Sequence, residues 1–136
     1  VTGKEGEPFI SPHLLELRPF LRKGDFLSGG WGHDVIDELR PVDIKVEKVA
    51  YSAFHQSRLE YVLGKAGIET LLVGGIVTNG GVASTVRDAH VRGFKTVVLS
   101  DGTAAFSKEN HEAAIGSLAT VSDVATCAEM VGLLGR

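Results

Sequence analysis

The chain has 136 residues, of which 43% are hydrophobic, and its formal net charge at pH 7 is −3. This length and composition allow one globular domain with its own core. The weakly acidic balance offers no basic surface for nucleic acid, and no apolar run approaches the ~20 residues that a membrane span needs, so we expect neither partner. The single cysteine, Cys127, excludes an internal disulfide and indicates a reducing compartment, so we expect a cytoplasmic protein.

The first part of the chain gives weak structural signals. Residues 1–30 read as an irregular lead-in because glycines and prolines interrupt them. The segment HDVIDEL, residues 33–39, is predicted to form a short helix that Pro41 stops. The alternating sequence DIKVEKV over Asp43–Val49 predicts a strand.

A helix and a buried strand are predicted next. Ser57 and Glu60 have the spacing of a capping box, and apolar residues then recur at helical spacing. Gly67 is predicted to be the C′ residue of this helix. The continuous apolar run TLLVGGI, over Thr70–Ile76, is typical of a central parallel strand.

Helices and strands continue to alternate towards the C-terminus. We predict a helix with Val82, Val86 and Ala89 on its apolar side, ended by Gly93, and then a buried strand over Lys95–Ser100. The elements expected after it are a helix over Ser107–Ala119 with Ser107 as N-cap, a short edge strand in TVSDVA, and a last helix opened by a capping box of Thr126 and Glu129. This order predicts an α/β fold with a mostly parallel sheet.

The turn that follows Thr70–Ile76 is the first candidate site, since ligands of open α/β sheets bind beyond the carboxyl ends of the strands. Gly75 and Gly80 have the spacing of a phosphate loop, but the Lys and the Ser or Thr that should follow are absent. The turn does present backbone N–H groups at a helix N-terminus, which suit an oxyanion or a carboxylate. The alternative is that its glycines only permit a tight connection.

Other reactive side chains have weaker support. Lys48 ends its predicted strand and could stabilise charge with an altered pKa, or lie at the surface. Asp101, at a strand end, is expected to cap the next loop. Cys127 is expected to be an inert, packed side chain. His111, one turn into its predicted helix, is expected to pack or cap. No histidines have a metal-ligand spacing, so we predict no metal site and no cofactor.

Three blocks in order resemble the isochorismatase-like hydrolases, also called cysteine hydrolases. They are KVAYSAF from Lys48, GIVTNGGVASTVRDA from Gly75 and GFKTVVLSD from Gly93. The resemblance runs from about Gly24 to the C-terminus. It implies a three-layer αβα sandwich around a parallel sheet of order 3-2-1-4-5-6, within a homodimer or homotetramer.

Amidases of this family use an Asp–Lys–Cys triad whose thiol attacks an amide carbonyl. By resemblance, the lysine matches Lys48 and the cysteine position falls on Gly81. A cis peptide bond is expected between Ile76 and Val77, and the N–H groups of Val77 and Gly81 are expected to form the oxyanion hole. Thr78 and two residues of the first block, Tyr51 and Phe54, complete the expected substrate site.

Two departures from the family leave alternatives open. Isochorismatases proper also carry glycine at the position of Gly81 and cleave a vinyl ether without a covalent intermediate, whereas "TN" at 78–79 is closer to the amidases. We therefore expect a hydrolase of a small amide or an isochorismate-like vinyl ether, with an inactive small-molecule binder or oligomeric scaffold as the alternative. Nothing resembles the family segment that carries the Asp, so we expect residues 1–136 to be one domain that lacks its N-terminal strands.

Overall fold

The computed structural model describes residues 11–19, 21 and 29–135. The chain divides into two compact units, residues 1–49 and 50–136. In the first unit, much of the predicted lead-in lies outside the described residues. The prediction that it is irregular is wrong for α1 (Pro12–Leu17), where the Ser11 hydroxyl accepts a hydrogen bond from the Leu14 N–H. Pro12 occupies the first turn, where the missing N–H of proline costs nothing, so it starts this helix instead of breaking it.

Residues 34–45 of the first unit are joined by an exposed carboxylate, Asp34. Asp34 binds Lys45 at 2.6 Å and Arg40 at 2.8 Å, and the Lys45 hydrogen bond is the main reason that the pKa of Asp34 falls to about 2. Asp34 also accepts the N–H of Val35. This side chain competes for the backbone N–H groups of the segment. The helix predicted over 33–39 is therefore split into the single turns η2 (Trp31–His33) and η3 (Asp37–Leu39).

The strand predicted over Asp43–Val49 is wrong. These residues form neither a strand nor a bridge, and all but Val46 are exposed. A strand needs a partner for its backbone N–H and C=O groups. No strand among the described residues pairs with this segment, so alternation in the sequence is not sufficient to make it one.

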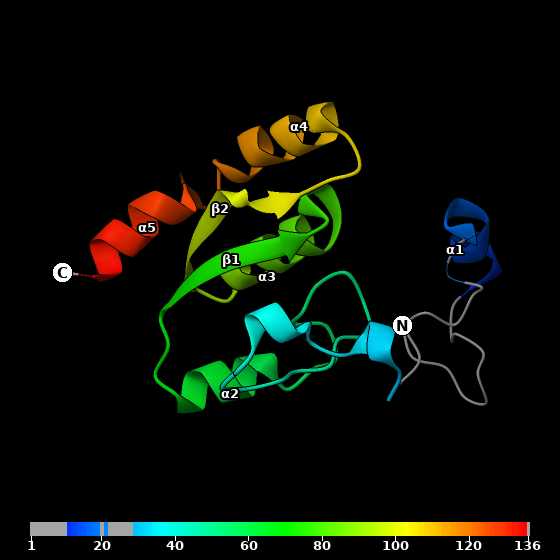
Figure 1. Cartoon of the computed structure of the whole chain (residues 1–136), viewed down its shortest axis with the longest axis horizontal. Coiled ribbons are helices and arrows are strands. Elements are labelled where there is room, and N and C mark those ends of the chain that lie inside the picture. Colours follow the sequence, from blue (N-terminus) through cyan, green and yellow to red (C-terminus); the bar gives the residue numbers. More distant parts are fainter. Residues whose placement is uncertain (1–10, 20, 22–28, 136) are drawn as a thin grey trace. The chain divides into compact units, whose positions relative to one another are not determined.

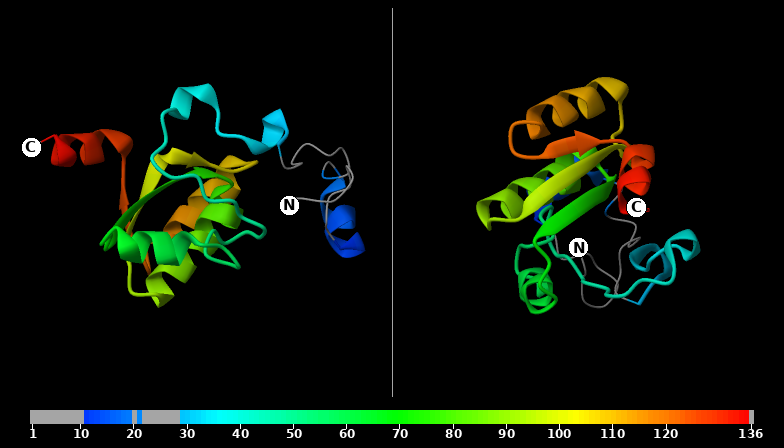
Figure 2. Two further views of the ribbon diagram at one scale, coloured as in Figure 1. Left: turned by 90° about the horizontal axis from the view of Figure 1, so that it is seen from below. Right: turned by 90° about the vertical axis from the view of Figure 1, so that its left-hand side faces the viewer.

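The second unit is an α/β fold with a parallel three-stranded sheet of order β1-β2-β3, which confirms the predicted fold class (Figure 1). Its elements in chain order are α2 (Leu59–Lys65), β1 (Thr70–Ile76), η4 (Thr78–Val82), α3 (Ala83–Val91), β2 (Lys95–Ala104), α4 (Lys108–Leu118), β3 (Asp123–Ala125) and α5 (Cys127–Leu134). Two further views show α5 projecting beyond the sheet (Figure 2).

Most local signals around these elements are confirmed. Gly67 has φ +67° after α2, Ser107 accepts the Asn110 N–H at the start of α4, and Thr126 and Glu129 form the capping box of α5. The capping box predicted at Ser57 is wrong, because the N-cap of α2 is Arg58. The Ser57 hydroxyl donates to the Ala53 carbonyl, four residues earlier, and accepts the N–H of Leu59, the first residue of α2, at 3.2 Å.

Two predictions for the sheet need correction. β2 continues four residues beyond the predicted end at Ser100, because after an irregularity in the register Thr103 and Ala104 pair with the end of β1. β1 was expected to be a central strand, yet in the described sheet it lies at an edge, with β2 as its partner. Its last residue, Ile76, is 78% exposed.

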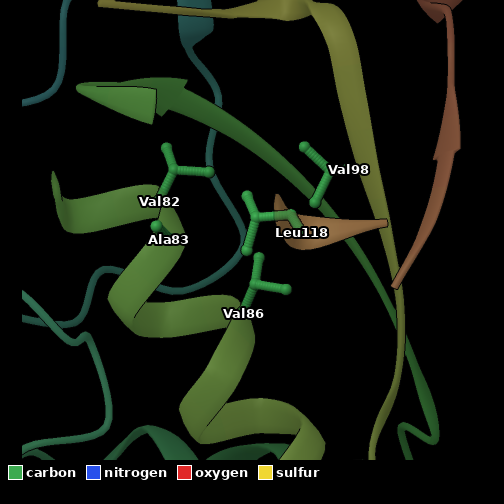
Figure 3. Close-up of a cluster of buried hydrophobic side chains, with 5 residues drawn as sticks. All are labelled: Val82, Ala83, Val86, Val98 and Leu118. Carbon is green, nitrogen blue, oxygen red and sulfur yellow. The ribbon is translucent and has the colours of Figure 1, made fainter. Parts of the chain in front are cut away.

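The core of the second unit lies on one face of the sheet. Val82, Ala83 and Val86 of the turn and α3 meet Leu118 of α4 over Val98 of β2 (Figure 3). Because α3 and α4 share this cluster, they cover the same face, and the turn after β1 is held from behind by packed side chains. None of the described helices is both long enough and apolar enough to cross a bilayer.

Candidate active site

The turn between β1 and α3 has the geometry expected of an active-site elbow. The peptide bond between Ile76 and Val77 is cis, as predicted. The Val77 carbonyl then accepts two hydrogen bonds, from the Gly80 N–H at 3.0 Å and the Val82 N–H at 3.3 Å. The turn, η4, continues directly into α3, so its amides are those of a helix N-terminus, where partial positive charge favours an anionic group.

Gly80 and Gly81 differ in whether the turn has room for a side chain at their positions. A Cβ on Gly80 would lie 2.8 Å from Cγ2 of Val77, which the present packing does not allow. A Cβ on Gly81 would lie 3.5 Å from the carbonyl oxygens of Ile76 and Tyr51, an ordinary contact distance. Tight-turn sterics therefore account for Gly80 but not for Gly81, where the turn has room for a side chain.

The segment from Tyr51 to Ser57 forms one side of this turn. The Ala53 N–H donates to Thr85 Oγ1 at 3.0 Å, which fastens the segment to α3 and keeps the Tyr51 carbonyl beside Gly81. Tyr51 itself is 41% exposed. The segment and the turn thus come together although 30 residues separate Tyr51 from Gly81.

Phe54, in the same segment, is a buried packing residue. Its ring lies 5.7 Å from the Phe94 ring, and the Arg92 guanidinium stacks 5.0 Å from its centroid. Arg92 also binds Glu60 at 2.9 Å. Arg92 therefore joins α2 to the end of α3 with the Phe54 ring packed against it, and the expected contact of Phe54 with substrate stays a prediction.

Thr78 is placed behind the turn. Its side chain is 0% exposed, and Oγ1 lies 2.9 Å from Nδ1 of His111 on α4. The sequence indicated only packing or capping for His111. No sequence signal could have found this contact, because it joins residues 33 positions apart in different elements.

Lys48 belongs to the first unit, whereas the turn belongs to the second. Its side chain is exposed overall. The protein atoms around part of it nevertheless lower the pKa of the ammonium group by desolvation. A lowered lysine pKa fits a charge-stabilising group, and the catalytic role of Lys48 stays a prediction.

Asp101 caps α5 and not, as predicted, the loop directly after it, whereas Cys127 fits its predicted inert role. Asp101 Oδ1 accepts the Cys127 N–H at 2.7 Å, so the carboxylate caps α5, and this bond is the main cause of the lowered pKa of Asp101. The same carboxylate raises the pKa of the Cys127 thiol. A raised pKa means less thiolate at neutral pH, which is the opposite of an activated cysteine.

Asp101→Asn is expected to lower the melting temperature at pH 7 but not at acid pH. A carboxylate whose pKa is lowered by folding stabilises the protein above its unfolded pKa, about 3.8. That stabilisation disappears as the pH falls through the lower, folded value. Thermal unfolding at pH 7 and near pH 2–3 tests this, with Asp123→Asn on β3 as the control. An equal difference between wild type and Asp101→Asn at both pH values would contradict it.

One further feature lies at the strand ends. Thr103, which pairs with Gly75 across the sheet, has a buried hydroxyl without a hydrogen-bond partner among the described residues. The part of the chain that the structure describes shows no cluster of three or more His, Cys, Asp or Glu side chains suited to a metal ion.

Comparison with known proteins identifies relatives of this chain. The family model described as "Isochorismatase domain" matches residues 5–129. Nicotinamidase 3 of Arabidopsis thaliana is 37% identical over 97 residues, covering 68% of this chain and 49% of that protein. Ureidoacrylate amidohydrolase RutB of Pseudomonas savastanoi pv. phaseolicola is 37% identical over 128 residues, covering 87% and 52%. The chain thus spans about half the length of these curated relatives.

Comparison with solved structures also finds hydrolases of this kind. A cysteine hydrolase from Pseudomonas syringae pv. phaseolicola superimposes with a TM-score of 0.80 at 27% identity, covering 93% of this chain and 65% of that one. An isochorismatase-like hydrolase from Alkaliphilus metalliredigens gives a TM-score of 0.75 at 34% identity, covering 79% and 62%.

Proposed function

Because the chain belongs to the isochorismatase family, we propose that it forms part of a hydrolase that acts on a small amide. The observation that carries this proposal is the elbow after β1. Its amides lie at the N-terminus of α3, and Gly81 leaves space in front of them beside the carbonyl groups of Ile76 and Tyr51. A polarised carbonyl group of a substrate suits such a site.

The proposed roles follow the family resemblance. The N–H groups of Val77 and Gly81 bind the oxygen of the substrate carbonyl as negative charge develops on it. Lys48, whose pKa is lowered by desolvation, stabilises charge. Since Gly81 stands where the family amidases have cysteine, water is the attacking group: its oxygen bonds to the carbonyl carbon, the C–N bond breaks, and the proton that the water loses passes to the nitrogen of the leaving amine.

An amide is favoured over the vinyl ether of isochorismatases proper. Two relatives of the chain, a nicotinamidase and a ureidoacrylate amidohydrolase, are by name amide hydrolases. Thr78 and Asn79 also match the amidase branch in our sequence analysis. The vinyl ether stays the alternative substrate because glycine at position 81 is shared with isochorismatases proper.

Ammonia release from nicotinamide and ureidoacrylate, beside turnover of isochorismate, tests the proposal. We expect the purified protein to hydrolyse at least one of the amides, and Lys48→Ala to lower kcat by roughly 10²-fold, the usual cost of losing one charge-stabilising group. Lys65→Ala, which removes an exposed lysine of α2, is the control. Turnover of isochorismate but of neither amide would show that the substrate is the vinyl ether and not an amide.

A catalytically inactive binder is the second candidate, and Gly81 is the observation that favours it. Such a protein has no side chain at the elbow to attack a substrate. Titration of nicotinamide, ureidoacrylate and isochorismate by calorimetry separates the two candidates. Binding without turnover of any of the three would establish the binder and overturn the hydrolase.

We further propose that the protein is a cytoplasmic homo-oligomer. The lone Cys127 fits a reducing compartment. Exposed apolar side chains on β1 and α5, among them Leu72, Leu133 and Leu134, fit burial against another chain. Light scattering of the purified protein at two concentrations measures the oligomeric state.

A further inference from the structure

The contact between buried Thr78 and partly exposed His111 joins the elbow to α4, the helix whose Leu118 also packs on Val82 of the elbow. Thr78 is the first residue of η4, directly after the cis bond and Val77. His111 lies in the first turn of α4. The 2.9 Å contact between Oγ1 and Nδ1 is a side-chain bond between two separate elements.

The direction of this hydrogen bond follows from burial. The Thr78 side chain is 0% exposed and has no other hydrogen-bond partner among the described residues. A buried hydroxyl is stable when its hydrogen has an acceptor. The arrangement that satisfies it has the Thr78 hydroxyl donating to an unprotonated Nδ1, with the imidazole hydrogen on Nε2.

Each partner is itself held in place. The His111 N–H donates to the Ser107 carbonyl at 3.1 Å, and Ser107 caps α4 by accepting the Asn110 N–H. The imidazole therefore stands on a capped helical turn and not on a loop. On the other side, the Thr78 carbonyl accepts the N–H of Ala83, the first residue of α3.

We propose that His111 is a positioning residue for the elbow. By accepting the Thr78 hydroxyl, it holds the turn over residues 77–82 against α4 and so fixes the direction of the Val77 and Gly81 N–H groups. The consequence for catalysis rests on the proposed function, whereas the effect on the turn itself does not. A histidine that only fills space would leave the turn unchanged when replaced by another side chain of similar bulk.

Side-chain replacements at position 111 separate positioning from packing. His111→Asn places an amide oxygen one bond beyond Cγ, where Nδ1 lies, and so keeps the acceptor. His111→Gln carries the same group one carbon further, near the place of Nε2. His111→Leu keeps bulk without any acceptor. Thr78→Ser and Thr78→Val make the matched pair on the other side of the bond.

Hydrogen exchange at the Gly80 and Val82 amides measures the effect, because both donate to the Val77 carbonyl within the turn. We expect roughly tenfold faster exchange in His111→Leu, His111→Gln and Thr78→Val, with near wild-type rates in His111→Asn and Thr78→Ser. The double variant of Thr78→Val and His111→Leu should exchange no faster than either single variant, because both remove one bond. Amides of β3 and α5 serve as the control.

Equal behaviour of the Asn and Gln variants, wild-type protection in the Leu variant, or additive effects in the double variant would each overturn the positioning role. If His111→Leu does not fold, the Asn and Gln comparison decides. Ammonia release is measured on the same proteins, and His111→Gln is expected to lower kcat more than it changes KM. If wild type is inactive but the exchange pattern holds, the proposed function fails and the positioning role stands.

Discussion

Leu118→Ala is expected to lower the free energy of unfolding by about 2–5 kcal/mol, the usual cost of removing a fully buried leucine side chain. Leu118 is 0% exposed and meets Val82, Val86 and Val98 in the core (Figure 3). Its loss leaves a cavity between α4 and the sheet that these branched side chains cannot fill without leaving their rotamers. In a domain with a total stability of 5–15 kcal/mol, this is a large fraction.

Chemical denaturation of both proteins measures this loss. Val91→Ala is the control, because Val91 lies on α3 of the same unit with 81% of its surface exposed. Its replacement should change the free energy of unfolding by less than about 0.5 kcal/mol. Similar losses for the two variants would show that the cluster over Val98 is not the core of this unit. Because Val82 of η4 belongs to the cluster, Leu118→Ala is also expected to loosen the elbow.

Gly81→Cys is expected to create a thiol that reacts about tenfold faster with iodoacetamide at pH 7 than Cys127 of the same chain. The new Cβ fits between the Ile76 and Tyr51 carbonyl groups at 3.5 Å. At the N-terminus of α3 the helix dipole favours the thiolate and lowers the thiol pKa by about one unit or more. Cys127 is the internal reference, because Asp101 raises the pKa of its thiol.

Peptide mass spectrometry after timed alkylation gives both rates in one experiment. Gly80→Cys provides the structural control, since its Cβ would meet Val77 Cγ2 at 2.8 Å and the variant should be less stable than Gly81→Cys. A thiol at position 81 that reacts no faster than Cys127 would show that the turn does not stabilise negative charge. Ammonia release by Gly81→Cys above the wild-type rate would identify the glycine as the reason for slow amide chemistry.

The candidate site was predictable from the sequence only in part. The elbow was predictable because a strand, a glycine turn and a helix adjoin in the chain, whereas the cis bond before Val77 was expected from the family resemblance. The contact of Tyr51 with Gly81 and the burial of Phe54 beside Phe94 were not predictable. Both features depend on contacts between residues that are far apart in the sequence.

The sequence by itself determined the elements whose ends carry their own hydrogen-bonding or conformational signal. Ser107 and the pair of Thr126 and Glu129 start helices because their side chains satisfy backbone N–H groups within the same turn. Gly67 ends α2 because glycine adopts a positive φ without steric cost. Such interactions span three or four residues and do not depend on the rest of the fold.

Only the tertiary structure decided the other features. The alternating segment over residues 43–49 forms no strand, since strand formation depends on a partner that local sequence does not contain. The Ser57 hydroxyl donates to the Ala53 carbonyl besides accepting the Leu59 N–H, and the Thr78 hydroxyl is bonded to His111 of another helix. A polar side chain that is buried must take the partner that folding brings within reach, and that choice is made by packing over long separations in the chain.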